Sequence, residues 1–291
     1  MDILKFLLAP FVASLILTGI HAYLGVHVVE RGVIFVDIAL AQIAALGATV
    51  GILLGMNIHA GGTYWVSLGF TFLGAAMISV LRTKDSQIPQ EAIIGIIYVV
   101  ASAAAILVMS KAVGETEHLK DMLVGNILAV SWPEVGKTAV LYSMVGAFHY
   151  IFRKKFLAIS IDAKAAEAQG INVRWWDFLF YVSFGFVVTS SVAIAGVLLV
   201  FCYLIVPSVG AILFAESIGH RLAIGWTMGT LVSALGVYLS LKIDLPTGAT
   251  IVCTFGAVLL LMAAVRVLFF RNRSESISRV EAIHRIGAKA H

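Results

Sequence analysis

Charged residues are scarce in this 291-residue chain. Asp, Glu, Lys and Arg make up 12% of the sequence, whereas hydrophobic residues make up 60% and the mean hydropathy is +1.00. Soluble domains usually carry about 25% charged residues, so this composition excludes an ordinary soluble protein. Because an α-helix satisfies its own backbone in lipid, the chain is predicted to be an all-α, polytopic membrane helix bundle.

Cysteines and catalytic motifs are also few. Cys202 and Cys253 lie in apolar runs without zinc-type spacing, which predicts reduced, packed side chains. The sequence has no complete phosphate-binding Gly-x-x-x-x-Gly-Lys-Ser/Thr loop, no His-Glu-x-x-His and no nucleophile elbow. We therefore expect a protein that is not an enzyme, needs no cofactor of its own and hydrolyses no ATP by itself.

Long apolar runs fill most of the chain, and each can cross about 30 Å of hydrocarbon as a helix. The uncharged run from Phe178 to Phe214 is too long for one crossing, and we divide it at residues 189–191. The start of the chain has no basic segment and no small-residue cleavage site, so it is predicted to be a retained first span. The nine predicted spans are residues 3–26, 33–54, 63–82, 91–113, 135–152, 175–191, 195–215, 222–242 and 248–270.

Basic residues in the loops predict the orientation. With the N-terminus outside, fifteen of the 20 Lys and Arg residues fall on the cytoplasmic side. The positive-inside rule thus favours an outer N-terminus and a cytoplasmic C-terminus in the inner (plasma) membrane. Residues 1–270 are predicted to form one membrane domain, and residues 271–291 a cytoplasmic tail.

Two connections between spans are longer than a hairpin requires, and long loops often carry function. The outer one, 114–134, contains an amphipathic stretch, 119–128, that suits a helix lying in the interface. In the inner one, 159–174, Asp162 can cap a short helix that Gly170 then stops. The inner connection is predicted to be a compact polar helix between two spans.

Polar side chains inside spans are costly in lipid and are functional candidates for that reason. Asp37 and Gln42 lie five positions apart in the second span, about 140° around a helix. Asp37 suits either a pathway carboxylate or a helix cap, and Gln42 either a pathway group or an inter-helix hydrogen bond. His21 and His149 suit either ligands for a passing divalent cation or packed histidines. These four are the candidate pathway residues, and no metal site can be assigned.

Several motifs, in order and spacing, resemble one family. The pattern Asp162-x-x-x-Ala166-x-x-x-Gly170 resembles the coupling helix of ABC importer permeases, and the whole chain resembles the ABC-3 family of metal-uptake permeases. Further matching stretches are Glu91–Ile96, Leu123–Ser131, Gly196–Leu199 with Val206-Pro207, and Asp244–Thr250.

This resemblance implies a homodimeric permease with a fold similar to that of the vitamin B12-type importers. A divalent metal ion (zinc, manganese or iron) would arrive on an extracytoplasmic substrate-binding protein. A separate cytoplasmic ABC ATPase, which holds ATP and Mg²⁺, would dock on a coupling helix at about 161–173, with Asp162, Ala166 and Gly170 coupling the two. Nucleic acid is not among the implied partners.

One position departs from the family pattern. Gln42 stands where members commonly have the histidine of a Ser-His-Ala stretch, and Asp37 lies one place earlier than the usual aspartate. Glutamine is a poorer zinc ligand than imidazole, so a non-metal or chelated-metal substrate stays open. A secondary ion-coupled transporter is the other alternative, although it would usually show charged residues near the middle of several spans.

Overall fold

The computed structural model describes residues 3–56, 61–82, 88–111 and 127–287. This part of the chain is helical throughout and contains no strand, which confirms the predicted all-α class. The outer stretch 119–128 lies almost entirely outside the described residues. The elements are α1 (Ile3–Glu30), α2 (Val36–Leu53), α3 (Gly61–Val80), α4 (Gln90–Met109), the 3-10 turn η1 (Ile127–Ala129), α6 (Trp132–Ile151), α7 (Arg153–Ile161), α8 (Ala163–Ala168), α9 (Val173–Ala195), α10 (Val197–Ile212), α11 (Ile218–Ile243) and α12 (Thr247–Gly287).

Seven of the described helices are long and apolar enough to cross a membrane: α1, α2, α3, α4, α9, α11 and α12. The prediction of nine spans is therefore too high by this criterion. The apolar helix α10 has 16 residues, or about 24 Å at 1.5 Å per residue, which is short of a full crossing. The 20-residue helix α6 carries Glu134 and Lys137 in its first two turns and is less apolar than α1 and α9, against which it packs.

The division of the long apolar run was also predicted at the wrong place. Helix α9 continues through 189–191 to Ala195, and the break lies at Gly196, whose φ is +76°. Hydroxyls inside α9 do not interrupt it, because Ser190 and Ser191 donate to the carbonyls of Phe186 and Val187 one turn earlier. Glycine alone adopts this backbone conformation readily, so Gly196 ends one helix and begins the next.

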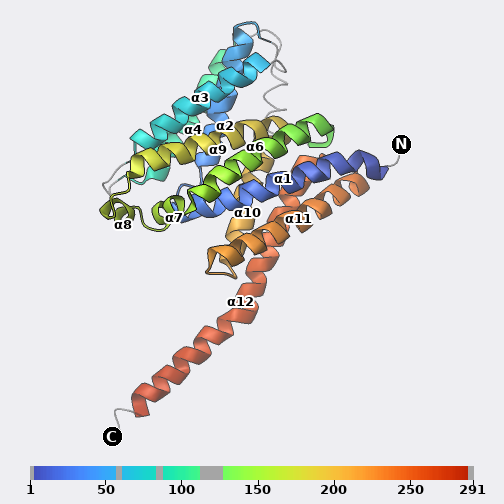
Figure 1. Ribbon diagram of the computed structural model, residues 1–291. Coiled ribbons are helices and arrows are strands. Elements are labelled where there is room, and N and C mark those ends of the chain that lie inside the picture. Colours follow the sequence, from blue (N-terminus) through green and yellow to red (C-terminus); the bar gives the residue numbers. More distant parts are fainter. Residues whose placement is uncertain (1–2, 57–60, 83–87, 112–126, 288–291) are drawn as a thin grey trace.

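The helices pack as an elongated bundle, from which α12 extends (Figure 1). Helix α2 packs against α3 and α4, whereas α1 packs against α10 and α11. Helix α9 contacts α2 and α3 of the first group and α10 of the second, and thereby joins the two groups. At Gly25 of α1, an added Cβ would lie 2.0 Å from the carbonyl oxygen of Leu204, so glycine permits the close approach of α1 and α10.

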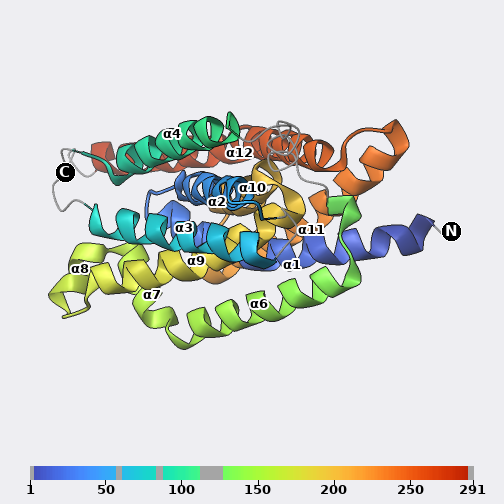
Figure 2. The same ribbon diagram turned by 90° about the horizontal axis from the view of Figure 1, so that it is seen from above.

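Burial is uneven around the bundle. In an apolar 18-residue stretch of α2, 72% of the residues are buried, whereas the corresponding shares are only 22% in α4 and 17% in α12. Viewed from above, α4 and α12 lie on one side of the bundle and α6 on the opposite side (Figure 2). The predicted boundary between membrane domain and tail, 270/271, falls within α12 and stays a prediction.

Candidate functional site

A sharp helical turn lies at one end of the bundle, between α7 and α9. The Asp162 side chain accepts a hydrogen bond from the backbone N–H of Ala165 (3.0 Å) and so caps α8. Ala166 is buried, and Gly170 follows α8 with a φ of +82°. The predicted cap, short helix and glycine stop are therefore all present, although the helix itself covers only Ala163–Ala168.

A cavity of about 880 Å³ lies beside this turn. Its walls come from the ends of α1 and α3 and from the segment between α7 and α9. Charged side chains of both signs line it: Glu30, Arg31, Arg82, Asp162, Lys164, Glu167 and Arg174. A partner that touches α8 would therefore also lie next to the ends of two membrane-spanning helices.

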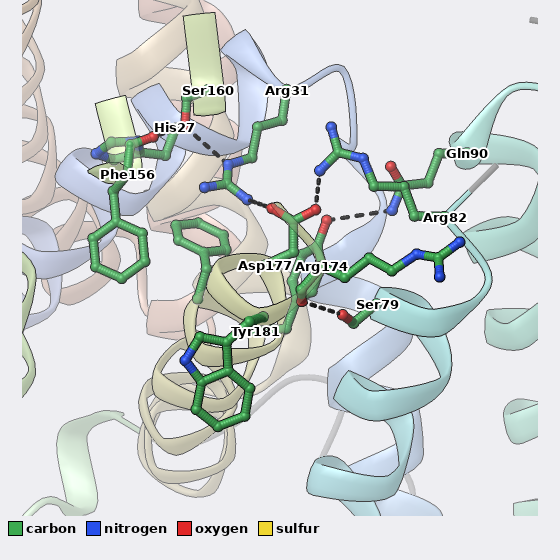
Figure 3. Close-up of polar contacts among 12 residues, drawn as sticks. His27, Arg31, Ser79, Arg82, Gln90, Phe156, Ser160, Arg174, Asp177 and Tyr181 are labelled. Carbon is green, nitrogen blue, oxygen red and sulfur yellow. Dashed lines mark hydrogen bonds and ion pairs between the residues drawn. The ribbon is translucent and has the colours of Figure 1, made fainter. Parts of the chain in front are cut away.

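Asp177 is the buried anion at this end of the bundle. Its side chain is 0% exposed and forms ion pairs with Arg31 (2.6 Å) and with Arg82 (Figure 3). Arg31 follows α1 and Arg82 follows α3, while Asp177 belongs to α9. Arg31 Nε also donates to Ser160 Oγ of α7 (2.9 Å). The Asp177 carboxylate thus joins three helix ends, and Arg31 adds a fourth through Ser160.

Two guanidinium groups share this single carboxylate. Burial lowers the pKa of Arg31 and of Arg82 from the ordinary value. Arginine nevertheless keeps its proton in proteins, so the cluster holds one positive charge in excess. The guanidinium of Arg31 lies 3.9 Å from the ring centroid of Phe180, a cation–π contact that partly replaces hydration.

A second polar group continues from Ser160 into the bundle. Ser160 donates to the carbonyl of Phe156, so its contact with His27 Nδ1 (2.8 Å) places the proton on that nitrogen. The rings of Tyr23 and His149 pack against His27 at centroid distances of 4.8 and 6.4 Å. Tyr23 Oη, His27 Nε2 and His149 Nδ1 are buried without a hydrogen-bond partner among the described residues.

His21 and His149, the two histidines among the candidate pathway residues, occupy different environments. Both ring nitrogens of His21 are in contact with protein oxygens, Nδ1 with the carbonyl of Leu17 (2.7 Å) and Nε2 with Ser191 Oγ (3.1 Å). His21 therefore fits a packed histidine. In His149, Nε2 is in contact with Ser183 Oγ (2.8 Å), whereas Nδ1 has no hydrogen-bond partner among the described residues.

Asp37 and Gln42 lie in α2, apart from the histidines. Asp37 is 1% exposed, and neither carboxylate oxygen has a hydrogen-bond partner in the described part of the chain. It does not cap the helix, because Phe35 occupies the N-cap position. Gln42 is 8% exposed. An unpartnered carboxylate in a membrane-spanning helix is costly, which favours the pathway role of Asp37 over the capping role.

The four pathway candidates do not form one site. Within the described residues, no hydrogen bond or ion pair joins the α2 pair to His21 or His149, and no group of three or more His, Cys, Asp or Glu could hold a metal ion. Within the described part of the chain, the four candidates are therefore separate polar groups and do not form a closed coordination sphere.

Sequence reasoning missed Arg31, Arg82, Asp177 and His27. The available signal was the lone carboxylate Asp177 in the first turns of an apolar run. Its partners lie 146 and 95 positions away, so only the packing identifies them.

Comparison with known proteins gives a consistent match. The model of the ABC 3 transport family matches residues 3–266. The chain is 27% identical over 276 residues to manganese transport system membrane protein MntC of Listeria innocua, covering 94% of this chain and 96% of that protein.

A second relative comes from Haemophilus influenzae, where it is named "Probable iron transport system membrane protein"; it is 25% identical over 269 residues, which are 90% of this chain and 96% of that protein. Among solved structures, PsaBC from Streptococcus pneumoniae in complex with Fab matches with a TM-score of 0.74 at 24% identity, over 88% of this chain and 90% of that one. This likeness shows a shared fold.

Proposed function

Because this chain belongs to the ABC 3 transport family and is a multi-pass transport subunit rather than an enzyme, we propose that it forms the pathway for manganese(II) or iron(II) in an ABC importer. The observation that carries the proposal is the family match over nearly the whole chain, with relatives that are named for manganese and iron transport. Both ions bind carboxylate and amide oxygens, so the side chains of Asp37 and Gln42 suit manganese(II) or iron(II) better than they suit zinc.

The cytoplasmic turn supports a docking role toward a separate ATPase, which would hold ATP and Mg²⁺. Asp162, Ala166 and Gly170 shape this turn, and the adjacent cavity reaches Arg31 and Arg82. We assign coupling to α8 with its flanking residues, and delivery of the metal to a binding protein on the outer side. The excess of Lys and Arg on the α8 side supports a cytoplasmic location of this end in the plasma membrane, with an outer N-terminus.

Weak burial of α4 and α12 supports a homodimer through that side of the bundle. Large apolar residues are exposed there, for example Val99 and Val100 at 60% each and Leu260 at 72%. A second copy against these helices would place the α2 helices of the two protomers near the dimer axis, since α2 packs directly on α4. Two Asp37 carboxylates and two Gln42 amides could then line one shared pathway.

The test is metal uptake by cells that express the chain with its ATPase and binding protein and lack other manganese importers. We expect accumulation of radiolabelled manganese that an excess of iron(II) inhibits, and loss of at least nine-tenths of the uptake in Asp37→Asn, which keeps the shape but removes the charge. Membrane levels of the variant serve as the control.

Two results would overturn this assignment. Uptake that needs a metal chelate, with no entry of the free ion, would assign a chelated substrate. Unchanged manganese uptake in Asp37→Asn would remove the carboxylate from the pathway.

A further inference from the structure

A long groove lies between α6 and α11, with α1 as its floor. Its volume is about 620 Å³, and its lining is almost entirely apolar. The lining residues that matter here are Ile20, Tyr142, Gly146, Arg153, Leu222 and Trp226. From Ala139 to Arg153 the groove spans about 21 Å at 1.5 Å per residue, which exceeds the roughly 15 Å depth of one leaflet's hydrocarbon.

Small residues hollow out the groove. At Gly19 and Gly146, an added Cβ would meet no atom within 4 Å, so both positions face open space. Trp226 Nε1 donates to the carbonyl of Gly19 (3.0 Å) and holds α11 against α1 beneath the opening. This bond fixes the α11 wall to the floor of the groove, while the space between α6 and α11 stays open.

One end of the groove is cationic. Arg153 is the first residue of α7, and its guanidinium lies 4.3 Å from the ring centroid of Tyr150. No carboxylate pairs with Arg153 among the residues that the structure describes. The cation lies at the α7–α8 end of the bundle, where the proposed orientation places the cytoplasmic surface of the membrane (Figure 1).

The groove is also placed to meet lipid. Helix α6 lies opposite the weakly buried side formed by α4 and α12 (Figure 2). A homodimer through α4 and α12 would therefore leave the groove facing the bilayer. Open apolar length, a cation at the headgroup level and a bilayer-facing position occur together here.

We propose that this groove binds an anionic phospholipid of the cytoplasmic leaflet, with an acyl chain between α6 and α11 and the phosphate at Arg153. Basic pockets between membrane helices on the cytoplasmic side recognise anionic headgroups by charge. The phenol of Tyr150 adds a polar group at the same depth. The bound lipid fills the open space between α6 and α11.

The experiment counts lipids retained by the purified full chain in its complex with the ATPase. The protein is exchanged into detergent micelles that contain equal amounts of phosphatidylglycerol and phosphatidylcholine with matched acyl chains, and bound lipids are measured by native mass spectrometry. We expect the wild type to retain phosphatidylglycerol over phosphatidylcholine. Arg153→Gln should reduce the retained phosphatidylglycerol about fivefold and leave phosphatidylcholine unchanged, since one basic residue near the surface contributes about that factor.

A pair of glycine variants locates the lipid. Gly146→Phe fills the groove without a clash at Cβ and should abolish retention of both lipids. Gly136→Phe is the matched control, because Gly136 is on the same helix, has equally open surroundings and is not part of the groove lining.

Equal retention of the two lipids by the wild type, or undiminished retention in Gly146→Phe, would overturn the proposal. Loss of the dimer in Gly146→Phe would show that a second copy covers the groove and would overturn it as well. The measurement needs no transport, so its outcome is independent of the metal that is carried.

Discussion

At the scale of single residues, the cluster around Asp177 holds together the α8 end of the bundle. Its carboxylate is fully buried and holds Arg31 and Arg82, which arrive from two other helices. Removing one partner of a buried ion pair leaves an uncompensated charge, which costs about 3–5 kcal/mol. Removal of the Asp177 carboxylate would leave two guanidinium groups, those of Arg31 and Arg82, without this anionic partner.

We therefore expect Asp177→Asn to destabilise the chain by about 3 kcal/mol or more, seen as a lower thermal unfolding midpoint of the purified protein in detergent. Combining it with Arg82→Gln should recover part of the loss, because one of the two unpaired cations is removed. Asp162→Asn is the control, since asparagine caps a helix about as well as aspartate. An unfolding midpoint like that of the wild type in Asp177→Asn would exclude this cluster as a structural support.

At the scale of elements, the short helix α8 and the turn after it depend on one backbone conformation. Gly170 has a φ of +82°, and its backbone N–H donates to the carbonyl of Glu167 (2.9 Å). An added Cβ would meet no atom within 4 Å, so a substitution acts through the backbone and not through a clash. The consequence should be confined to the shape of the α8 turn.

Gly170→Val should strain this turn by about 1–2 kcal/mol, because a β-branched residue avoids left-handed conformations. We expect the variant to fold and insert normally but to lose most of the stimulation of ATPase activity by the loaded binding protein. Gly170→Asn should retain that stimulation, since asparagine tolerates the same φ. If Gly170→Val transports metal at the wild-type rate, α8 is not the coupling element.

The same elements show how far the sequence alone could lead. The α8 turn follows local rules of capping and glycine placement, so the cap at Asp162 and the helix stop at Gly170 were correctly predicted. The break in the long apolar run was misplaced, because Ser190 and Ser191 satisfy their hydroxyls within the helix and do not end it. The Asp177 cluster depends on residues far apart in the chain, and periodicity and composition carry no information about such contacts.

At the scale of the whole molecule, the bundle presents two different faces to its surroundings. The face with α4 and α12 is broadly apolar and weakly buried, and the opposite face carries the groove beside α6. The α8 end bears the charged cavity and the excess of basic residues. A partner ATPase at that end, a second copy at α4 and α12 and lipid along α6 would together cover the molecule without competing for surface.

The source of energy for transport distinguishes this arrangement from an ion-coupled transporter. The measurement is accumulation of manganese in proteoliposomes that contain the chain, its ATPase and its binding protein, with ATP inside or absent and with ion gradients set independently. We predict accumulation only when ATP and the ATPase are both present, unchanged by ionophores that collapse the gradients. Accumulation by this chain alone, driven by an ion gradient and indifferent to ATP, would contradict its role as an ABC importer permease.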